Sequence, residues 1–161
     1  MANEQANQFD IYISYSHDQS RLVQSQKEKL VAAGFCVWID IENQPVDDES
    51  LPEWLSNAII RSLLVLVFFS KAYESSENCQ CELMFAKSKK KPILYIRGEA
   101  NCRPDGWLCF VMKNAIYVDL TGKKYEEQWK SLIERINKGI NSSISGKRMN
   151  KRSKFFIIFN I

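Results

Sequence analysis

Apolar residues gather in five short runs along the chain, each separated from the next by polar or helical sequence. The runs cover 9–15, 35–39, 63–69, 92–97 and 115–120. Most are rich in β-branched and aromatic residues, which is typical of β-strands. The run 63–69 is apolar at every position, as in a strand buried on both faces, and it predicts a central parallel strand.

Between these runs, apolar residues recur with the spacing of amphipathic helices. Helices are expected over 21–33, 51–62, about 77–90 and 125–140, with one or two helical turns over 106–112. Ser20 is a candidate N-cap for the first helix, and Gly34 follows it where a left-handed residue commonly ends a helix. Ser50 and Glu53 form a capping-box pattern. The alternation of strands and helices predicts an α/β fold, with a parallel sheet covered by helices on both faces.

The length of 161 residues is typical of a single domain. Residues 1–8 are polar and are expected to be a disordered lead-in, followed by a folded domain over 9–140. Residues 141–161 combine serine, glycine, asparagine and basic residues with a final apolar run, FFIIFNI. Apolar residues show no regular spacing over 141–154, so we expect a linker or a disordered segment there.

Composition narrows the classes of function. The net charge of +3 is small, and much of the excess lies in the tail, which argues against a dedicated nucleic-acid binder. The cysteine count of five is odd and no secretory signal opens the chain, so free thiols in the cytoplasm are expected. Cys79 and Cys81 have no second pair or histidine cluster beside them, and no metal is expected. No apolar run approaches the roughly 18–20 residues that a membrane span needs.

The segment 70–86, SKAYESSENCQCELMFA, carries the most distinctive pattern. Its polar and aromatic residues recur regularly at Ser70, Tyr73, Ser76, Cys79 and Glu82, followed by Ala86. On a helix Cys79, Glu82 and Ala86 share one face, while Leu83 and Phe85 point toward the core. Glu82 therefore lies after a strand–loop–helix junction, near the crevice where open α/β sheets bind ligands. It is either a carboxylate held for chemistry or a solvated acid near a helix start.

Other candidate residues follow the first two predicted strands. Tyr15, Ser16 and His17 belong to the first loop at the carboxyl edge of the sheet, and Trp38 ends the second strand. Two of them have a simpler interpretation than substrate binding. Trp38 would pack in the core, and His17 would be an exposed loop residue. The remaining candidates are Asp40 and Glu42 at the start of the acidic loop 40–50, and Ser70, Tyr73 and Cys79 around the third junction.

Several of these stretches together resemble a TIR domain (Toll/interleukin-1 receptor-like). FDIYISYSHDQ is similar to the first sequence box of the family, and GFCVWIDIEN to its second strand and the start of its BB loop. The S-x-x-Y-x-x-S-x-x-C-x-x-E-x-x-x-A pattern is the most specific part, and KPILYIRG and RPDGWL resemble the following segments of animal cytosolic members. The resemblance covers 9–140 and implies a flavodoxin-like, five-stranded parallel sheet in the order 2-1-3-4-5.

The resemblance also implies a function. Some TIR domains cleave NAD+ at the nicotinamide–ribose bond, giving nicotinamide and ADP-ribose or cyclic ADP-ribose, and self-association activates them in immune or cell-death signalling. Glu82 matches their catalytic glutamate. The residues expected to bind NAD+ are Tyr15, Ser16, His17, Trp38, Asp40, Ser70, Tyr73 and Cys79. The BB loop expected to join neighbouring chains comprises Glu42, Asn43, Gln44, Pro45, Val46 and Asp47. NAD+ would be a substrate and no cofactor is expected, since no G-x-G-x-x-G is present.

Two other functions fit parts of the pattern. A non-catalytic TIR adaptor would signal by assembling with other TIR domains, and adaptors often keep a glutamate at the position of Glu82. However, the chain lacks the Arg-Asp-x-x-Pro-Gly run of the receptors and adaptors and their Phe-Trp near Trp129, which favours the NAD-cleaving branch. A phosphoacceptor or a flavin binder would also fit the fold class alone. Phosphoacceptance, however, needs paired acidic residues at the end of the first strand, and here Asp10 lies at its start.

Overall fold

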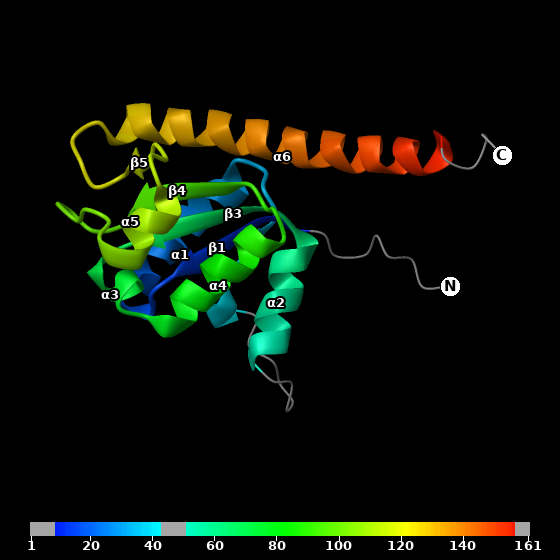
Figure 1. The fold of residues 1–161 in the computed structure, drawn as a ribbon. Helices are drawn as coiled ribbons and strands as arrows, with labels where there is room; N and C mark the ends of the chain where they lie inside the picture. The colour runs from blue at the N-terminus through cyan, green and yellow to red at the C-terminus, as the bar shows by residue number, and fades with distance from the viewer. Residues whose placement is uncertain (1–8, 43–50, 157–161) are drawn as a thin grey trace.

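The computed structural model describes residues 9–42 and 51–156, without the side chains of 51, 52 and 147–156. Five parallel strands form one sheet in the order β2-β1-β3-β4-β5, which confirms the predicted flavodoxin-like topology (Figure 1). The strands are β1 (Phe9–Tyr15), β2 (Val37–Trp38), β3 (Ser62–Phe69), β4 (Ile93–Arg97) and β5 (Val118–Asp119).

The two edge strands are shorter than their apolar runs suggested. β2 and β5 contain two residues each, where 35–39 and 115–120 were expected. Each edge strand has a partner on one side only, so fewer of its residues are held in the ladder. The Cys36 carbonyl accepts from the amides of Asp10 and Ile11 just before β2, while Ile116 before β5 is 76% exposed.

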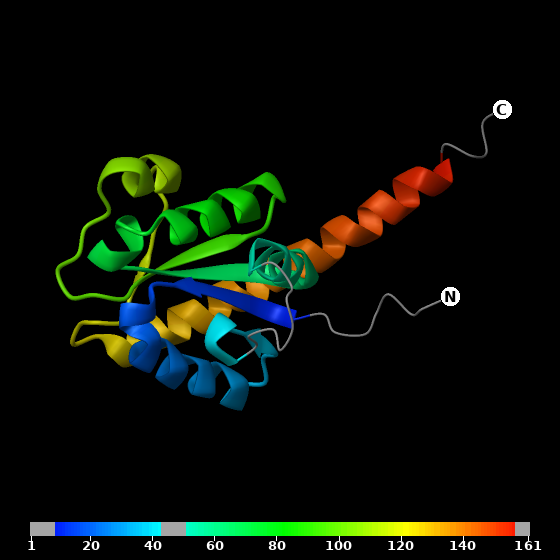
Figure 2. The ribbon, with the colours of Figure 1, turned by 90° about the horizontal axis from the view of Figure 1, so that it is seen from below.

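Helices cover both faces of the sheet, as Figure 2 shows. They are α1 (Ser20–Ala32), α2 (Leu51–Arg61), α3 (Lys71–Glu74), α4 (Glu77–Ser88), α5 (Gly106–Met112) and α6 (Tyr125–Phe156). Leu64, Leu66 and Phe68 of β3 pack in the core beneath α1 and α6, whereas the alternate residues, such as Val65 and Val67, belong to the core beneath α2 and α4. β3 is buried along its full length, as predicted.

The first helix starts differently from the prediction. A 3-10 turn, His17–Gln19, runs directly into α1, so Ser20 lies inside the helix and is not its cap. Gly34 does follow α1 with a left-handed φ of +97°, as predicted. A second 3-10 turn covers Asp40–Glu42. Ser50 of the proposed capping box lies outside the described residues.

The last helix continues to Phe156 and does not end near Ile140 as its apolar period suggested. Close packing holds its middle part against the sheet. A side chain at Gly139 would start 2.5 Å from the Leu64 Cδ1 atom, and the Ser143 hydroxyl donates to the Leu63 carbonyl at 2.9 Å. Across the described residues no helix is long and apolar enough to cross a membrane.

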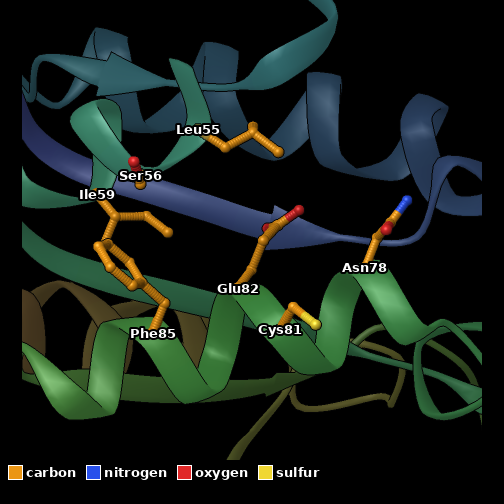
Figure 3. Close-up of a pocket in the computed structure, with 7 residues that line it drawn as sticks. All are labelled: Leu55, Ser56, Ile59, Asn78, Cys81, Glu82 and Phe85. Carbon is orange, nitrogen blue, oxygen red and sulfur yellow. The ribbon is translucent and has the colours of Figure 1, made fainter. Parts of the chain in front are cut away.

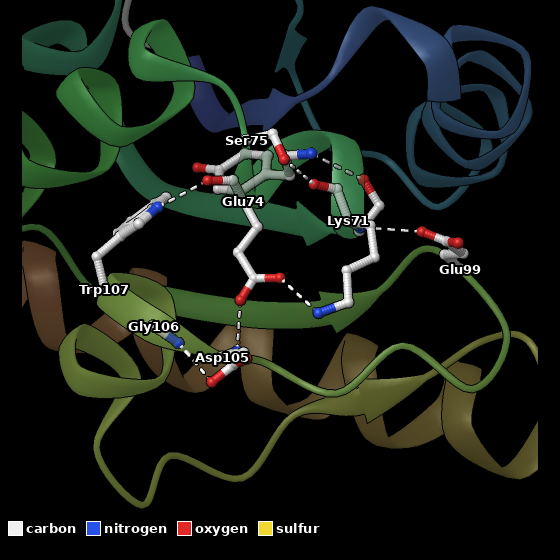
Figure 4. Close-up of polar contacts among 9 residues, drawn as sticks. Lys71, Glu74, Ser75, Glu99, Asp105, Gly106 and Trp107 are labelled. Atoms are coloured by element: carbon white, nitrogen blue, oxygen red, sulfur yellow. Dashed lines mark hydrogen bonds and ion pairs between the residues drawn. The ribbon is translucent and has the colours of Figure 1, made fainter.

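A polar network fixes the junction that precedes α4. The Glu74 carboxylate accepts hydrogen bonds from the Lys71 ammonium group and from the Asp105 amide (Figure 4). The Trp107 indole donates to the Glu74 carbonyl at 2.8 Å, and the Lys71 amide donates to Glu99. These bonds tie α3 to α5 and to the β4–α5 loop, so the start of α4 has a fixed position.

Candidate functional site

Glu82 lies in the second turn of α4 and points across the sheet toward β1. Cys79, Leu83 and Ala86 are buried on the same helix, which confirms the helical face predicted from their spacing. The Glu82 Oε2 atom accepts two hydrogen bonds, from the Ser14 hydroxyl at 2.8 Å and the Tyr12 hydroxyl at 3.0 Å. Glu82 is therefore held by two specific donors and is not a freely solvated acid.

The surroundings of Glu82 raise the pKa of its carboxyl group, so the protonated form is more stable here than it would be in water. Burial is the main cause, and it raises the Glu82 pKa from its ordinary value of 4.5 to about 7. Hydrogen bonds from Ser14 and Tyr12 oppose this rise because they stabilise the carboxylate, whereas the negative charge of Asp40 adds to it. A carboxyl with a pKa near neutral pH is a frequent feature of functional sites.

Glu82 lines two cavities. The first, of about 360 Å³, lies between α2 and α4 and is mainly apolar, with Leu55, Ile59 and Phe85 in its wall (Figure 3). Its other lining residues are Ser56, Asn78, Cys81 and Glu82. The second cavity, of about 300 Å³, is more polar and extends from Glu82 to the loop after β1. Leu55, Asn78 and Glu82 line both.

Five of the residues predicted to bind substrate line the polar cavity beside Glu82. They are Tyr15, Ser16, His17, Asp40 and Cys79. The His17 Nε2 atom lies 2.6 Å from an Asp40 oxygen, so the first loop and the end of β2 meet at the rim. The Cys79 thiol donates to the Tyr15 carbonyl at 3.5 Å, and burial raises its pKa to about 11. Cys79 is therefore an uncharged thiol at neutral pH.

Ser70 and Tyr73 do not line either of these two cavities, so their expected contact with substrate stays a prediction. Both are buried, and the Ser70 hydroxyl caps α3 by accepting from the Tyr73 amide at 3.1 Å. The Tyr73 hydroxyl lies 2.9 Å from the Ser14 hydroxyl and also donates to the Cys79 carbonyl. Tyr73 thus supports Ser14 from within the core.

Trp38 also reaches neither cavity. It is 3% exposed and stacks on the Tyr12 ring, with 4.8 Å between the ring centres. Trp54 meets it edge-on at 5.1 Å. Of its two interpretations, the structure favours core packing, against the ring of Tyr12, whose hydroxyl donates to Glu82.

Of the predicted BB-loop residues, Glu42 alone is described, and it forms an ion pair with Lys27. Asn43, Gln44, Pro45, Val46 and Asp47 lie outside the described residues, so their role stays a prediction.

Tyr12, Ser14 and Asn78 belong to the site although the sequence interpretation passed over them. Tyr12 and Ser14 are two positions apart in a strand, so their hydroxyl groups face the same side of the sheet. Asn78 precedes Glu82 by one helical turn. These spacings are visible in the sequence, but only the packing of α4 over β1 shows what they face.

The described residues contain no group of three histidine, cysteine or acidic side chains that could hold a metal ion. The five cysteines are free. The chemistry available here is that of a carboxylate with hydroxyl, amide and imidazole groups beside an apolar wall.

Comparisons with known proteins identify the family. The model of the TIR domain family matches residues 11–133. A comparison with curated proteins found no match. Among solved structures, the TIR domain of the Toll-related receptor TRR-2 from Hydra magnipapillata is similar, with a TM-score of 0.68 and 20% identity over 80% of this chain and 98% of that one.

The TIR domains of the activated Roq1 resistosome, which recognises the pathogen effector XopQ, are also similar. Their TM-score is 0.53 with 18% identity, over 84% of this chain and 82% of that one. At these identities the structural matches establish the fold, and the family assignment comes from the match over 11–133. The chain belongs to the TIR domain family.

Proposed function

We propose that this TIR domain cleaves NAD+ at the nicotinamide–ribose bond, releasing nicotinamide and ADP-ribose or cyclic ADP-ribose. The observation that carries the proposal is the position of Glu82. Glu82 lines both an apolar and a polar cavity, and its carboxyl group accepts from two hydroxyl donors and has a pKa of about 7. It therefore combines a reactive charge with adjacent space for a substrate.

A single carboxylate is sufficient for this reaction. The nicotinamide of NAD+ is already cationic, so it leaves with the electron pair of the C1′–N bond and needs no proton from an acid. The ribose left behind carries positive charge, which an adjacent carboxylate stabilises. Water then attacks C1′ and loses a proton to give ADP-ribose, or an internal nucleophile closes a cyclic product. Glycosidases, whose leaving groups are neutral, ordinarily use two carboxyl groups.

The two cavities suit different parts of NAD+. Leu55, Ile59 and Phe85 offer an apolar wall to an aromatic ring. On the polar side, Asn78 and Ser16 offer hydrogen-bonding groups to ribose hydroxyls. The Ser14 and Tyr12 hydroxyl groups hold the carboxylate itself. NAD+ is therefore a substrate in this proposal, and no bound cofactor is required.

Self-association is the second part of the proposal, with the chain acting in the cytoplasm in immune or cell-death signalling. Phe110 on α5 is 81% exposed and Ile116 is 76% exposed, so apolar side chains are available for contact with another chain. The same observation supports a second candidate function, a non-catalytic adaptor that assembles with other TIR domains.

One experiment separates the two functions. Purified protein is incubated with NAD+ across a series of protein concentrations, and nicotinamide, ADP-ribose and cyclic products are measured. The enzyme proposal predicts nicotinamide release that rises more steeply than protein concentration. The adaptor function predicts that NAD+ persists while light scattering shows assembly.

A further inference from the structure

The release of nicotinamide needs only the Glu82 carboxylate, yet two further ionisable side chains line the polar cavity beside it. His17 belongs to the 3-10 turn after β1, and Asp40 follows β2. The His17 Nε2 atom lies 2.6 Å from the Asp40 Oδ2 atom, while Asp40 Oδ1 accepts from the Ile41 amide at 2.8 Å. The Asp40 carboxylate is therefore held by its own turn, and it holds the imidazole of His17 at the rim.

The contact with Asp40 determines which nitrogen of His17 can accept a proton. A carboxylate only accepts hydrogen bonds, so Nε2 carries the hydrogen in the neutral ring and Nδ1 keeps its lone pair. Among the described residues, Nδ1 forms no hydrogen bond. The side chain of His17 is 71% exposed, so a proton accepted there can pass to solvent. A histidine that a carboxylate orients in this way is well suited to act as a general base.

Tyr15 contributes a buried hydroxyl group that has no partner. Tyr15 lines the same polar cavity and is 5% exposed, and its hydroxyl forms no hydrogen bond with a described residue. Burial raises the pKa of Tyr15 well above its ordinary value, and Asp40 adds to the rise, so the hydroxyl is neutral and can donate. An unpaired buried hydroxyl is unfavourable, and in a polar cavity it indicates a position for a small polar molecule such as water.

These groups lie close to the proposed catalytic carboxylate. The rings of Tyr15 and His17 are neighbours, with 5.9 Å between their centres. The pKa of Glu82 responds to both rim residues, because the charge of Asp40 raises it and a positive charge on His17 lowers it. The polar cavity therefore brings a base and an unpaired hydroxyl to the carboxylate that would face the ribose cation.

We propose that the polar cavity holds the water molecule that attacks the ribose, with His17 as its general base. Asp40 is the positioning residue for His17, and the Tyr15 hydroxyl is a hydrogen-bond partner of the water. This inference rests on the proposed cleavage of NAD+. The C1′–N bond breaks, and nicotinamide leaves with its electron pair. The water oxygen forms a bond to C1′ while its proton moves to the His17 Nδ1 atom. The imidazolium pairs with Asp40 until solvent takes the proton.

A base at this position favours one product over the other. Water must lose a proton when it attacks, whereas a ring nitrogen of adenine attacks C1′ with its lone pair and needs no proton removed beforehand. His17 therefore accelerates hydrolysis and not cyclisation, and ADP-ribose should be the main product. An added pyridine also attacks through a nitrogen lone pair, so it is a suitable competitor for water.

The test measures how the reaction divides between water and an added pyridine. The full chain at high concentration is incubated with NAD+ and a series of 3-acetylpyridine concentrations. The initial rates of formation of ADP-ribose and of the exchanged dinucleotide are then compared. Their ratio does not depend on how tightly a variant binds NAD+, because both products form from the same bound substrate.

Three variants separate the base from its surroundings. His17→Gln keeps a donor for Asp40 but cannot accept a proton, and Tyr15→Phe removes the unpaired hydroxyl but keeps the ring. Asp18→Asn is the matched control, because Asp18 is an exposed residue of the same 3-10 turn and does not line the polar cavity. Circular dichroism establishes that the variants keep the fold.

The proposal predicts that the ratio of ADP-ribose to exchanged dinucleotide falls about 10²-fold in His17→Gln, at the low end of general-base contributions. In Tyr15→Phe it should fall about 2- to 10-fold, because one hydrogen bond is lost. Asp18→Asn should keep the wild-type ratio. An unchanged ratio in His17→Gln, or an equal fall in Asp18→Asn, would overturn the inference while leaving NAD+ cleavage supported. Absence of nicotinamide release by the wild type would instead contradict the proposed function, and this inference with it.

Discussion

The Ser14 hydroxyl donates a hydrogen bond to the Glu82 carboxylate across 2.8 Å, although the two residues are 68 positions apart in the chain. Behind it, the Tyr73 hydroxyl lies 2.9 Å from Ser14 inside the core. The donor that holds the proposed catalytic carboxylate is thus itself held by a buried side chain. This arrangement makes the pKa of Glu82 sensitive to single hydroxyl groups.

Replacing Ser14 with alanine should raise the pKa of Glu82 further. The hydroxyl stabilises the charged carboxylate, and a hydrogen bond to a charged group contributes about 1.5–3 kcal/mol, so the rise should be about one pH unit or more. The acidic limb of the pH–rate profile should move to higher pH by that amount. A titration of the Glu82 carboxyl carbon by NMR measures the same shift without activity.

Tyr73→Phe is the matched control for Ser14→Ala. It removes a hydroxyl that contacts Ser14 but none that contacts Glu82. Its pKa shift should be clearly smaller than that of Ser14→Ala. Equal shifts in the two variants would mean that packing, and not the hydrogen bond from Ser14, sets the pKa of Glu82.

Replacing Glu82 with glutamine should change stability in a pH-dependent way. The folded state raises the Glu82 pKa from 4.5 to about 7, so it binds the proton more tightly than the unfolded state. The contribution of this group to stability is therefore present below about pH 4.5 and is lost as pH rises through 7. The glutamine variant avoids that loss, and its stability relative to wild type should increase with pH by up to about 3 kcal/mol.

Urea unfolding from pH 4 to pH 8 measures this difference. Glu126→Gln, at an exposed acid in the first turn of α6, serves as the control and should show a much smaller pH-dependent difference from wild type. A difference for Glu82→Gln that stays constant across the range would show that the pKa of Glu82 is not raised on folding.

Asn78→Ala should weaken substrate binding more than the chemical step. Asn78 lines both cavities and lies one helical turn before Glu82. Among the described residues, the hydrogen bonds to the Glu82 carboxylate come from Tyr12 and Ser14 and not from Asn78. Loss of one hydrogen bond to NAD+ should raise KM by about 2- to 10-fold and leave kcat nearly unchanged. Gln80→Ala, on the same helix and outside both cavities, should leave KM unchanged; equal changes in the two variants would exclude Asn78 from binding.

Trp38→Ala should act mainly on stability. Trp38 is buried against Tyr12 and Trp54, so its removal should cost about 3–5 kcal/mol in the free energy of unfolding. Trp38→Phe keeps an aromatic ring in the core, and its KM for NAD+ should remain close to wild type at temperatures where it is folded. A large rise in KM with little loss of stability would instead support contact between Trp38 and the substrate.

The sequence predicted those parts of the site that depend on local spacing. The steps of three and four residues from Cys79 to Ala86 placed Glu82 on the correct helical face. The contact with Ser14 depends on how α4 packs over β1, and no local pattern encodes that. Ser70 and Tyr73 shared the same sequence rhythm as Glu82, but they precede α4, and their hydroxyl groups turn into the core.

The ends of the helices and strands were predicted less well, because they too depend on tertiary packing. The apolar period that predicted α6 ends at Ile140, yet the helix continues, and just at that point Gly139 and Ser143 fit closely against Leu64 and Leu63 of β3. The edge strands β2 and β5 are short because each is paired on one side only. Both outcomes depend on tertiary contacts that apolar periodicity does not report.

The most direct test of the proposed function is nicotinamide release from NAD+ by the wild type and by Glu82→Gln, at equal and high protein concentration. Glutamine keeps the size of the side chain but removes its charge, and circular dichroism establishes that the fold is retained. The account predicts release by the wild type and a rate about 10²- to 10³-fold lower for the variant. Equal rates for the two proteins, or no release by the wild type at any concentration, would contradict it.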